Sequence, residues 1–482
     1  MEINDELIDR RLATLTTASS DTESWLEPSE IRRNGRKRQV RRRGAGIGGA
    51  VVVVVLLATL IPIGLRNKTP PDASLHVSAT LGPAIQLISA GHLGESTPTG
   101  RLPAAAAQSE QQFSLSLLKQ LSASGTPSSN ILVSPSSLSI ALSMLELGAR
   151  GDTETQIARA LDSGNLTAQQ QAAGWSALST ELALAGASDG ISVQSANSVW
   201  LQKGLAMDPT FMSSLSRYFA SGVWQVDFAS DPAGAIDALN RWVAQETHGH
   251  ITTLFAPGAI TNQTALILAN AVYFKAAWQQ PFSGTTSAGS FHLPSGTTTS
   301  VPYLRTPANA PLDGSAFVGS GVDAVQLPYQ GGRLAALIIM PTSGSISEFS
   351  ASFSQAELAH VVSSLAPSAL DLAMPSLSLS ASHELIPTLK GLGIQDAFDP
   401  GAADFSGMTS TPLVVTDVAQ KDTLSVTPWG SEATAATGVG MESSARRAAL
   451  ALVIDQPYLF LIRDRQTGEI LFEAQVVDPA RG

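Results

Sequence analysis

Two short motifs carry residue types that could catalyse a reaction or bind a metal. Residues 186–190 (GASDG) match the G-x-S-x-G pattern of serine hydrolases. That nucleophile needs a strand before it and a helix after it, whereas a helical pattern precedes Ser188 and a strand-like pattern follows it. His248 and His250 could form a metal pair, yet no third ligand lies near them in the sequence. We therefore expect no enzyme, no metal site and no cofactor.

The hydrophobic fraction, the lack of cysteine and the net charge exclude further classes of function. The chain has 482 residues, of which 44% are hydrophobic, enough for a sizeable core. It contains no cysteine, which excludes disulfides and thiol chemistry. The net charge of −11 argues against a nucleic-acid partner, because DNA and RNA attract basic surfaces.

Positive charge is concentrated at the N-terminus, directly before an apolar run. Arginines and lysines crowd 32–43, and 44–65 contains no charged residue. About 20 apolar residues span a bilayer, and a basic flank stays in the cytoplasm. We predict a basic cytoplasmic tail over 1–43, a single-pass signal anchor over 44–65, a Pro- and Gly-rich extracytoplasmic tether over 66–102 and a folded domain over 103–482. Within the tether, His76 to Ala90 could pack locally. The localisation predicted is therefore the cell membrane, with the folded domain outside. A cleaved signal peptide is the alternative, against which the long N-terminal tail argues.

The segment 430–447 (GSEATAATGVGMESSARR) has an unusual pattern of small residues. As a strand it would have two different faces, because side chains alternate along a strand. One face would carry Ser431, Ala433, Ala435 and Thr437, all uncharged, and the other would carry both glutamates. The segment is too rich in Gly and Ala to favour a strand by itself. It is typical of a loop that can become a strand.

This segment resembles the hinge of the reactive-centre loop of inhibitory serpins, and other segments extend the resemblance over 103–482. In chain order they are 130–137 (NILVSPSS), 197–200 (NSVW), 239–251 (LNRWVAQETHGHI), 268–278 (LANAVYFKAAW), 374–377 (MPSL), 389–394 (LKGLGI), 403–408 (ADFSGM) and 457–464 (PYLFLIRD). The resemblance implies the α+β serpin fold: three β-sheets with a large central one, about nine helices and an exposed reactive-centre loop at about 430–450. An Ala- and Gly-rich chain without cysteine and with a basic anchor is typical of a bacterium.

The resemblance also assigns site residues. The hinge comprises Gly430, Ser431, Glu432, Ala433, Thr434, Ala435, Ala436 and Thr437. The shutter and breach of the central sheet comprise Ser134, Ser137, Asn270, Trp278 and Gln420. The chain departs from the family twice: Gln420 replaces the usual shutter histidine, and Pro428 replaces a glutamate before the hinge. Glutamine still donates and accepts hydrogen bonds, whereas proline cannot donate to a sheet, so we expect insertion to begin after Pro428.

The function implied is inhibition of a serine endopeptidase by a suicide substrate, with a covalent acyl complex as the product. Counting forward from Gly430 places the reactive bond at Ser444–Ala445, which suits a protease with a small specificity pocket. Counting back from Pro457 places it at Arg446–Arg447, which suits a trypsin-like protease. We put the first bond ahead and keep the second as the alternative.

We expect a monomer whose partners are the protease and, through 44–65, the membrane. The alternative function is a non-inhibitory, membrane-tethered serpin that acts as a surface binding or scaffold protein.

Overall fold

The computed structural model describes residues 86–89, 102–126, 128–189, 191–219, 222–284, 286–319, 321–431 and 448–481. These residues belong to one compact unit, 70–482. The predicted tail at 1–43, the predicted span at 44–65 and most of the predicted tether lie outside the described residues, as does the loop over 432–447.

The prediction of a cell-membrane protein is wrong by the structural finding and is corrected here. Within the part of the chain that the structure describes, no helix combines the length and the apolar character needed to cross a bilayer. The apolar run that motivated the prediction lies outside that part, so no membrane localisation is assigned to the protein.

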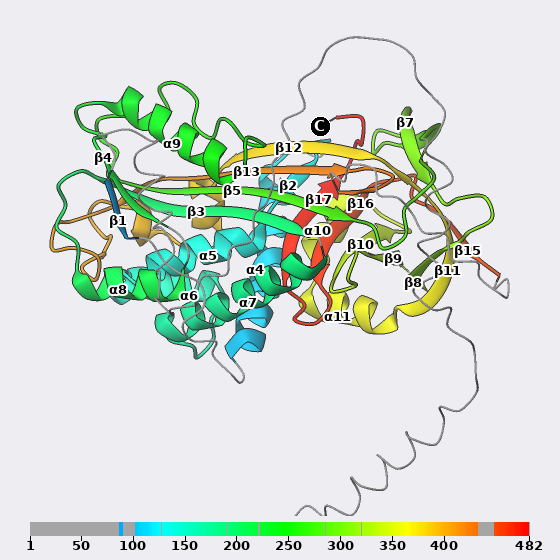
Figure 1. Ribbon diagram of the computed structural model, residues 1–482, viewed down its shortest axis with the longest axis horizontal. Coiled ribbons are helices and arrows are strands. Elements are labelled where there is room, and N and C mark those ends of the chain that lie inside the picture. Colours follow the sequence, from blue (N-terminus) through cyan, green and yellow to red (C-terminus); the bar gives the residue numbers. More distant parts are fainter. Residues whose placement is uncertain are drawn as a thin grey trace, which may run out of the picture. The chain divides into compact units, whose positions relative to one another are not determined.

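A seven-stranded sheet forms the centre of the unit (Figure 1). Its strand order is β1 (Gln86–Ser89), β4 (Val223–Val226), β3 (Ser192–Gln202), β5 (Leu266–Ala277), β13 (Val415–Val426) and β12 (Leu377–Glu384), with β14 (Gly430–Ser431) paired to β5. β5 and β13 run parallel, and each is antiparallel to its outer neighbour. The middle of the sheet is therefore a parallel seam between β5 and β13.

Strand β1 lies inside the segment predicted to be a tether. It pairs with β4 at the edge of the sheet. A strand of four residues between Pro- and Gly-rich stretches gives too short a pattern to detect in the sequence. This part of the predicted tether belongs to the folded unit.

A ten-stranded sheet packs beside the first one. Its order is β2 (Ile131–Val133), β17 (Ile470–Val476), β16 (Tyr458–Asp464), β10 (Leu334–Pro341), β9 (Val322–Pro328), β8 (Leu312–Val318), β11 (Ala366–Pro375), β7 (Thr298–Arg305) and β6 (Ser287–His292), with β15 (Leu450–Val453) on β11. The first half of β11 pairs with β8 and its end pairs with β7. Through this strand the two smaller sheets of the prediction are continuous.

Nine α-helices lie in the described part of the chain: α4 (Leu102–Ser124), α5 (Pro135–Glu146), α6 (Gly151–Ala160), α7 (Ala168–Asp189), α8 (Pro209–Tyr218), α9 (Pro232–Glu246), α10 (Ile346–Ser352), α11 (Gln355–Ser364) and α12 (Ile386–Gly391). α9 covers one face of the central sheet, and α4 to α8 lie on the other side (Figure 1). Ser188 lies in the last turn of α7, and strand β3 follows it. The predicted α+β fold with a large central sheet and about nine helices is confirmed.

Helix α5 begins directly beneath the seam, and its sequence explains why. Ser134 is the N-cap and its side chain accepts a hydrogen bond from the Ser137 N–H, while Pro135 occupies the first helical position. The first turn of a helix leaves its N–H groups unpaired. The Ser134 side chain accepts a hydrogen bond from one of them, and Pro135 has no N–H group. The helix start predicted from 134–137 is therefore observed, and it fixes these serines against the sheet.

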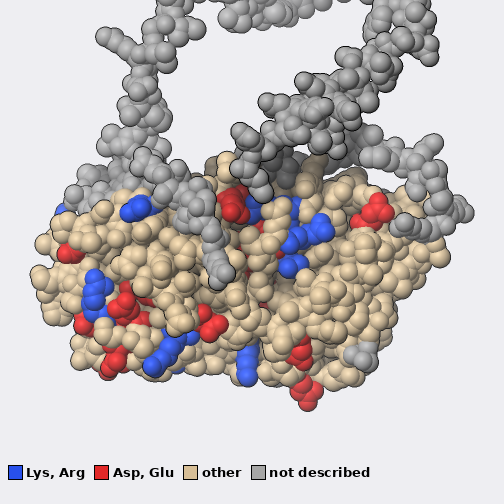
Figure 2. Space-filling model, turned by 90° about the horizontal axis from the view of Figure 1, so that it is seen from below, with Lys and Arg blue, Asp and Glu red and all other residues tan. Residues whose placement is uncertain are grey.

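The surface carries few charged side chains, as the 14% of charged residues in the sequence requires. On the face seen in Figure 2, acidic and basic side chains lie interspersed among a largely uncharged surface.

Candidate functional site

The seam between β5 and β13 buries two amide side chains opposite each other. The parallel register pairs Gln420 with Asn270, and each residue is 1% exposed. Buried amides require hydrogen-bond partners, because an unpaired one costs about 1–3 kcal/mol. The partners of these two residues therefore determine how firmly the seam is closed.

Asn270 is bonded to the helix and to the neighbouring strand. Its Nδ2 donates to Ser137 Oγ at 2.7 Å and to Asn197 Oδ1 at 2.6 Å. The Ser137 hydroxyl also lies 2.8 Å from Asn197 Oδ1 and 2.9 Å from Ser195 Oγ. This network joins β5, β3 and the first turn of α5.

Gln420 is bonded to the same helix turn from the other side of the seam. Its Nε2 donates to the Ser134 carbonyl oxygen at 2.9 Å. Among the hydrogen bonds of the described residues, none joins Gln420 to Asn270. The shutter, which we define as Ser134, Ser137, Asn270 and Gln420, thus bonds side chains of both strands to α5, while the backbone ladder pairs the strands with each other.

Several buried oxygen atoms at the closed seam have no hydrogen-bond partner. Asn270 Oδ1, Gln420 Oε1 and Asp422 Oδ2 are buried without a hydrogen-bond partner in the described part of the chain. Burial also raises the pKa of the Asp422 carboxyl well above its usual range, although a backbone hydrogen bond from Ser134 opposes that shift. These unpaired oxygens lower the stability of the closed arrangement.

At the far end of the seam the chain reverses and pairs with β5 again. β13 pairs with β5 as far as Thr423–Tyr273. The chain then turns at 427–430, where the Thr427 N–H donates to the Gly430 carbonyl oxygen at 2.8 Å, and β14 places Gly430 opposite Ala277 and Ser431 opposite Ala276. Gly430 has a φ of 146°, and a Cβ there would overlap the Ala276 carbonyl oxygen. Only glycine fits this position.

Ser431 occupies a buried site that we call the hinge seat, made by Ser431, Ala276, Trp278 and Tyr329. Ser431 is 0% exposed and its Oγ lies 2.9 Å from the Tyr329 hydroxyl. The Trp278 and Tyr329 rings stack at 4.5 Å, and Trp278 Nε1 donates to the Thr427 carbonyl oxygen at 3.0 Å. Ser431, the first loop residue on the uncharged face, is therefore already buried beside β5.

The structure separates the predicted site residues into groups. It brings Ser134, Ser137, Asn270 and Gln420 together beneath the seam, and it places Trp278, Gly430 and Ser431 at the hinge seat. The remaining hinge and reactive-bond residues lie outside the described part of the chain: Glu432, Ala433, Thr434, Ala435, Ala436, Thr437, Ser444, Ala445, Arg446 and Arg447.

Five residues of this site were missed from the sequence: Ser195, Asn197, Ala276, Tyr329 and Asp422. Asn197 carried little signal, because the strand around it, Ser192–Gln202 (SVQSANSVWLQ), mixes polar and apolar residues. Tyr329 carried no such signal, since it is far from Ser431 in sequence and only the fold joins them.

Comparison with known proteins decides the family. The model of the family described as "Serpin (serine protease inhibitor)" matches residues 108–479. The chain is a serpin. An uncharacterized serpin-like protein of Thermococcus kodakarensis is 30% identical over 377 residues, which cover 77% of this chain and 85% of that protein. The leukocyte elastase inhibitor of Bos taurus is 31% identical over 364 residues, 73% of this chain and 94% of the inhibitor.

Solved structures agree with this serpin in fold. The structure of native protease nexin-1 with heparin matches with a TM-score of 0.69 at 28% identity. The match covers 78% of this chain and 100% of protease nexin-1. Tengpin, a thermophilic serpin in its native state, has a TM-score of 0.70 at 22% identity, over 81% of this chain and 97% of tengpin.

Proposed function

We propose that this serpin inhibits serine endopeptidases as a suicide substrate. The protease attacks the loop and forms an acyl-enzyme. Cleavage then frees the loop to enter the seam between β5 and β13 as a new strand. The acylated protease is carried about 45 Å along the sheet by about 14 residues, and its distortion stops deacylation. The inhibitor is consumed in the process and turns over no substrate.

The observation that supports this proposal best is the position of β14 on β5. In an antiparallel pair each step forward on one strand is a step back on the other. If the pairing of Ser431 with Ala276 continues, Ala433 faces Phe274, Ala435 faces Val272 and Thr437 faces Asn270. Phe274 and Val272 are buried, so the loop residues that join them must be small and uncharged.

The outward positions fit the same register. Glu432 would face Lys275, which is half-buried, and opposite charges directly across an antiparallel pair stabilise it. The hinge therefore offers a neutral inward face and an outward charge that meets its partner. Charged or bulky inward residues would have favoured a non-inhibitory binding protein instead.

The proposed reactive bond is Ser444–Ala445, with Arg446–Arg447 as the alternative. Ser444 suits proteases with a small specificity pocket, and Arg446 suits those whose pocket carries an acid. The relative named as an elastase inhibitor agrees with a small-residue target.

The test is to incubate the full chain separately with an elastase-like, a subtilisin-like and a trypsin-like protease. We expect an adduct that survives boiling in detergent, and mass mapping of the released peptide should place the cut after Ser444. A cut after Arg446 with an adduct would move the reactive bond and keep the mechanism. Clean cleavage by all three without an adduct would contradict it and favour the binding-protein alternative.

A further inference from the structure

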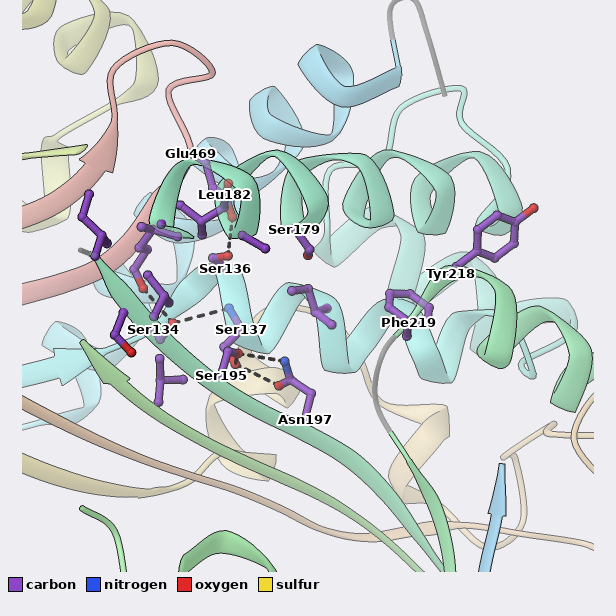
Figure 3. A pocket seen from close by; sticks show the side chains of 18 residues that line it. Ser134, Ser136, Ser137, Ser179, Leu182, Ser195, Asn197, Tyr218, Phe219 and Glu469 are labelled. Carbon is purple, nitrogen blue, oxygen red and sulfur yellow. Dashed lines mark hydrogen bonds between the residues drawn. The ribbon is translucent and has the colours of Figure 1, made fainter. Parts of the chain in front are cut away.

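A cavity lies between α5, α7 and β3, on the helix side of the central sheet (Figure 3). It encloses about 440 Å³, within the range of about 300–1,000 Å³ found for small-molecule pockets. Its floor includes Ser137, Ser195 and Asn197, which belong to the hydrogen-bond network around Asn270.

One end of the cavity carries an acid that lacks a positive partner. Glu469 lines this end and is 4% exposed. Ser136 Oγ donates to Glu469 Oε1 at 2.6 Å, whereas a carboxylate can accept about four hydrogen bonds. Among the described residues this is the hydrogen bond that reaches the carboxylate, so much of its accepting capacity is unused.

Neighbouring charges leave the same region short of cations. Arg333 is close enough for its positive charge to interact with Glu469. It is already paired, however, with Asp464 at 2.7 Å and with Glu181 at 3.3 Å. Burial, and after it the charge of Glu469, raises the pKa of the nearby Glu110 carboxyl well above its usual range, and Glu110 Oε1 is buried without a partner among the described residues. A positive charge entering this end would be attracted by the Glu469 carboxylate.

Away from its serines and Asn197, the cavity has apolar walls suited to hydrocarbon. Ile140, Leu182 and Val193 form its walls and Phe219 lies at its other end. A ligand that matches both parts needs a cationic head and a short apolar body.

We propose that this cavity binds a small organic amine, with its ammonium group on the Glu469 carboxylate and its hydrocarbon part against Ile140, Leu182 and Val193. A charge-assisted hydrogen bond in a buried site is worth more than a neutral one. The site therefore prefers an amine to an alcohol of the same length.

A second consequence rests on the proposed function. An amine in the cavity touches both α5, through Ile140, and β3, through Val193. β3 pairs with β5 over Ser192–Leu201, so both strands must shift relative to α5 when a strand enters the seam. The bound amine stabilises the closed arrangement and slows insertion.

Calorimetric titration of the full chain at pH 8 tests the binding site, with hexylammonium and 1-hexanol as probes. We expect hexylammonium to bind about tenfold more tightly, as a hydrogen bond to a charged group allows. Glu469→Gln should remove that preference and leave 1-hexanol binding intact, because glutamine keeps the shape and the bond from Ser136. Ser179→Phe should fill the cavity and weaken both probes, whereas Leu184→Phe, at a position 69% exposed on the same helix, should change neither.

Equal binding of the two probes, an unchanged preference in Glu469→Gln, or no binding by the wild-type chain would each overturn the site. The coupling is tested separately by the fraction of protease trapped with and without saturating hexylammonium, which should fall about fivefold, a typical coupling between sites. Binding without any change in trapping would overturn the coupling alone. If the chain traps no protease at all, the proposed function fails while calorimetry still decides the amine site.

Discussion

The two ends of the β5–β13 seam differ in what β5 touches. At the shutter, β5 pairs with β13, and both strands are bonded to the first turn of α5 through buried side chains. At the hinge seat, β5 has left β13 and pairs with the beginning of the loop. One strand thus has two different neighbours within a few residues.

This difference separates two tasks of the sheet. The hinge seat sets the direction and register in which a new strand would grow, because Ser431 is already buried opposite Ala276. In the proposed mechanism the shutter would resist that growth, since the bonds of Asn270 and Gln420 to α5 would have to break or move first. We expect substitutions at the hinge to change whether insertion succeeds, and substitutions at the shutter to change how easily it starts.

The largest effect is expected from Ala433→Arg. In the proposed register this side chain would meet Phe274, which is 0% exposed, and an unpaired buried charge costs several kcal/mol. Insertion should fail and the protein should become a substrate, with the trapped fraction falling by about tenfold or more. Glu432→Gln, one residue away on the outward face and opposite the half-buried Lys275, is the control and should retain most of the trapping. Equal loss in both variants would contradict the register.

The shutter is tested by Asn270→Ala. The change removes the donor to Ser137 and Asn197 and leaves those buried groups short of a partner. The free energy of unfolding should fall by about 1–3 kcal/mol, measured by urea denaturation of the uncleaved protein. Asn262→Ala, at an exposed position, should have no effect. A stability equal to that of the wild type would mean that the network does not hold the seam.

The stability of the shutter region should depend on pH, because buried acids accept hydrogen bonds from α5 and from the neighbouring helix α4. Glu469 accepts from Ser136 on α5 and Glu473 accepts from Ser114 on α4. Burial raises the pKa of Glu469 to about 7 and that of Glu473 to about 8. Since the folded state holds these protons more tightly than the unfolded one, their stabilising contribution is complete below about pH 4 and is lost as pH rises toward 8.

The melting temperature should therefore fall between pH 5 and pH 8. Glu473→Gln should make that fall smaller, and the exposed Glu357→Gln should leave it unchanged. A melting temperature that rises over this range in the wild type would contradict the assignment.

The smallest effect is expected at the outward pair of the hinge. Lys275→Glu would place like charges opposite each other when Glu432 enters the sheet, at a cost of about 0.2–1 kcal/mol. The trapped fraction should fall by about twofold, and Glu432→Lys combined with Lys275→Glu should restore it. Failure of the double variant to recover would argue against this pairing.

The architecture and the shutter residues were predicted from the resemblance to serpins, which rests on short stretches of local sequence. The capped start at 134–137 and the apolar strand around Asn270 are readable from neighbouring residues, and they place α5 and β5 correctly. The short edge strand β1 and the Ser431–Tyr329 contact are set by tertiary packing, and no nearby residue indicates them. The membrane prediction rested on composition alone, and it is the prediction that the structure contradicts.

The central claim is that the loop enters the seam in the register set by Gly430 and Ser431, and the absence of cysteine in the chain permits a direct test. In that register Ala436 faces Ala271, and opposite Cβ atoms in an antiparallel pair lie about 5 Å apart, within reach of a disulfide. The variant Ala271→Cys with Ala436→Cys should form no disulfide while the loop is intact and should form one after a protease cuts the loop. Ala269→Cys with Ala436→Cys, displaced by two residues, should form much less. A disulfide that never forms after cleavage, or equal yields from the two pairs, would contradict the account.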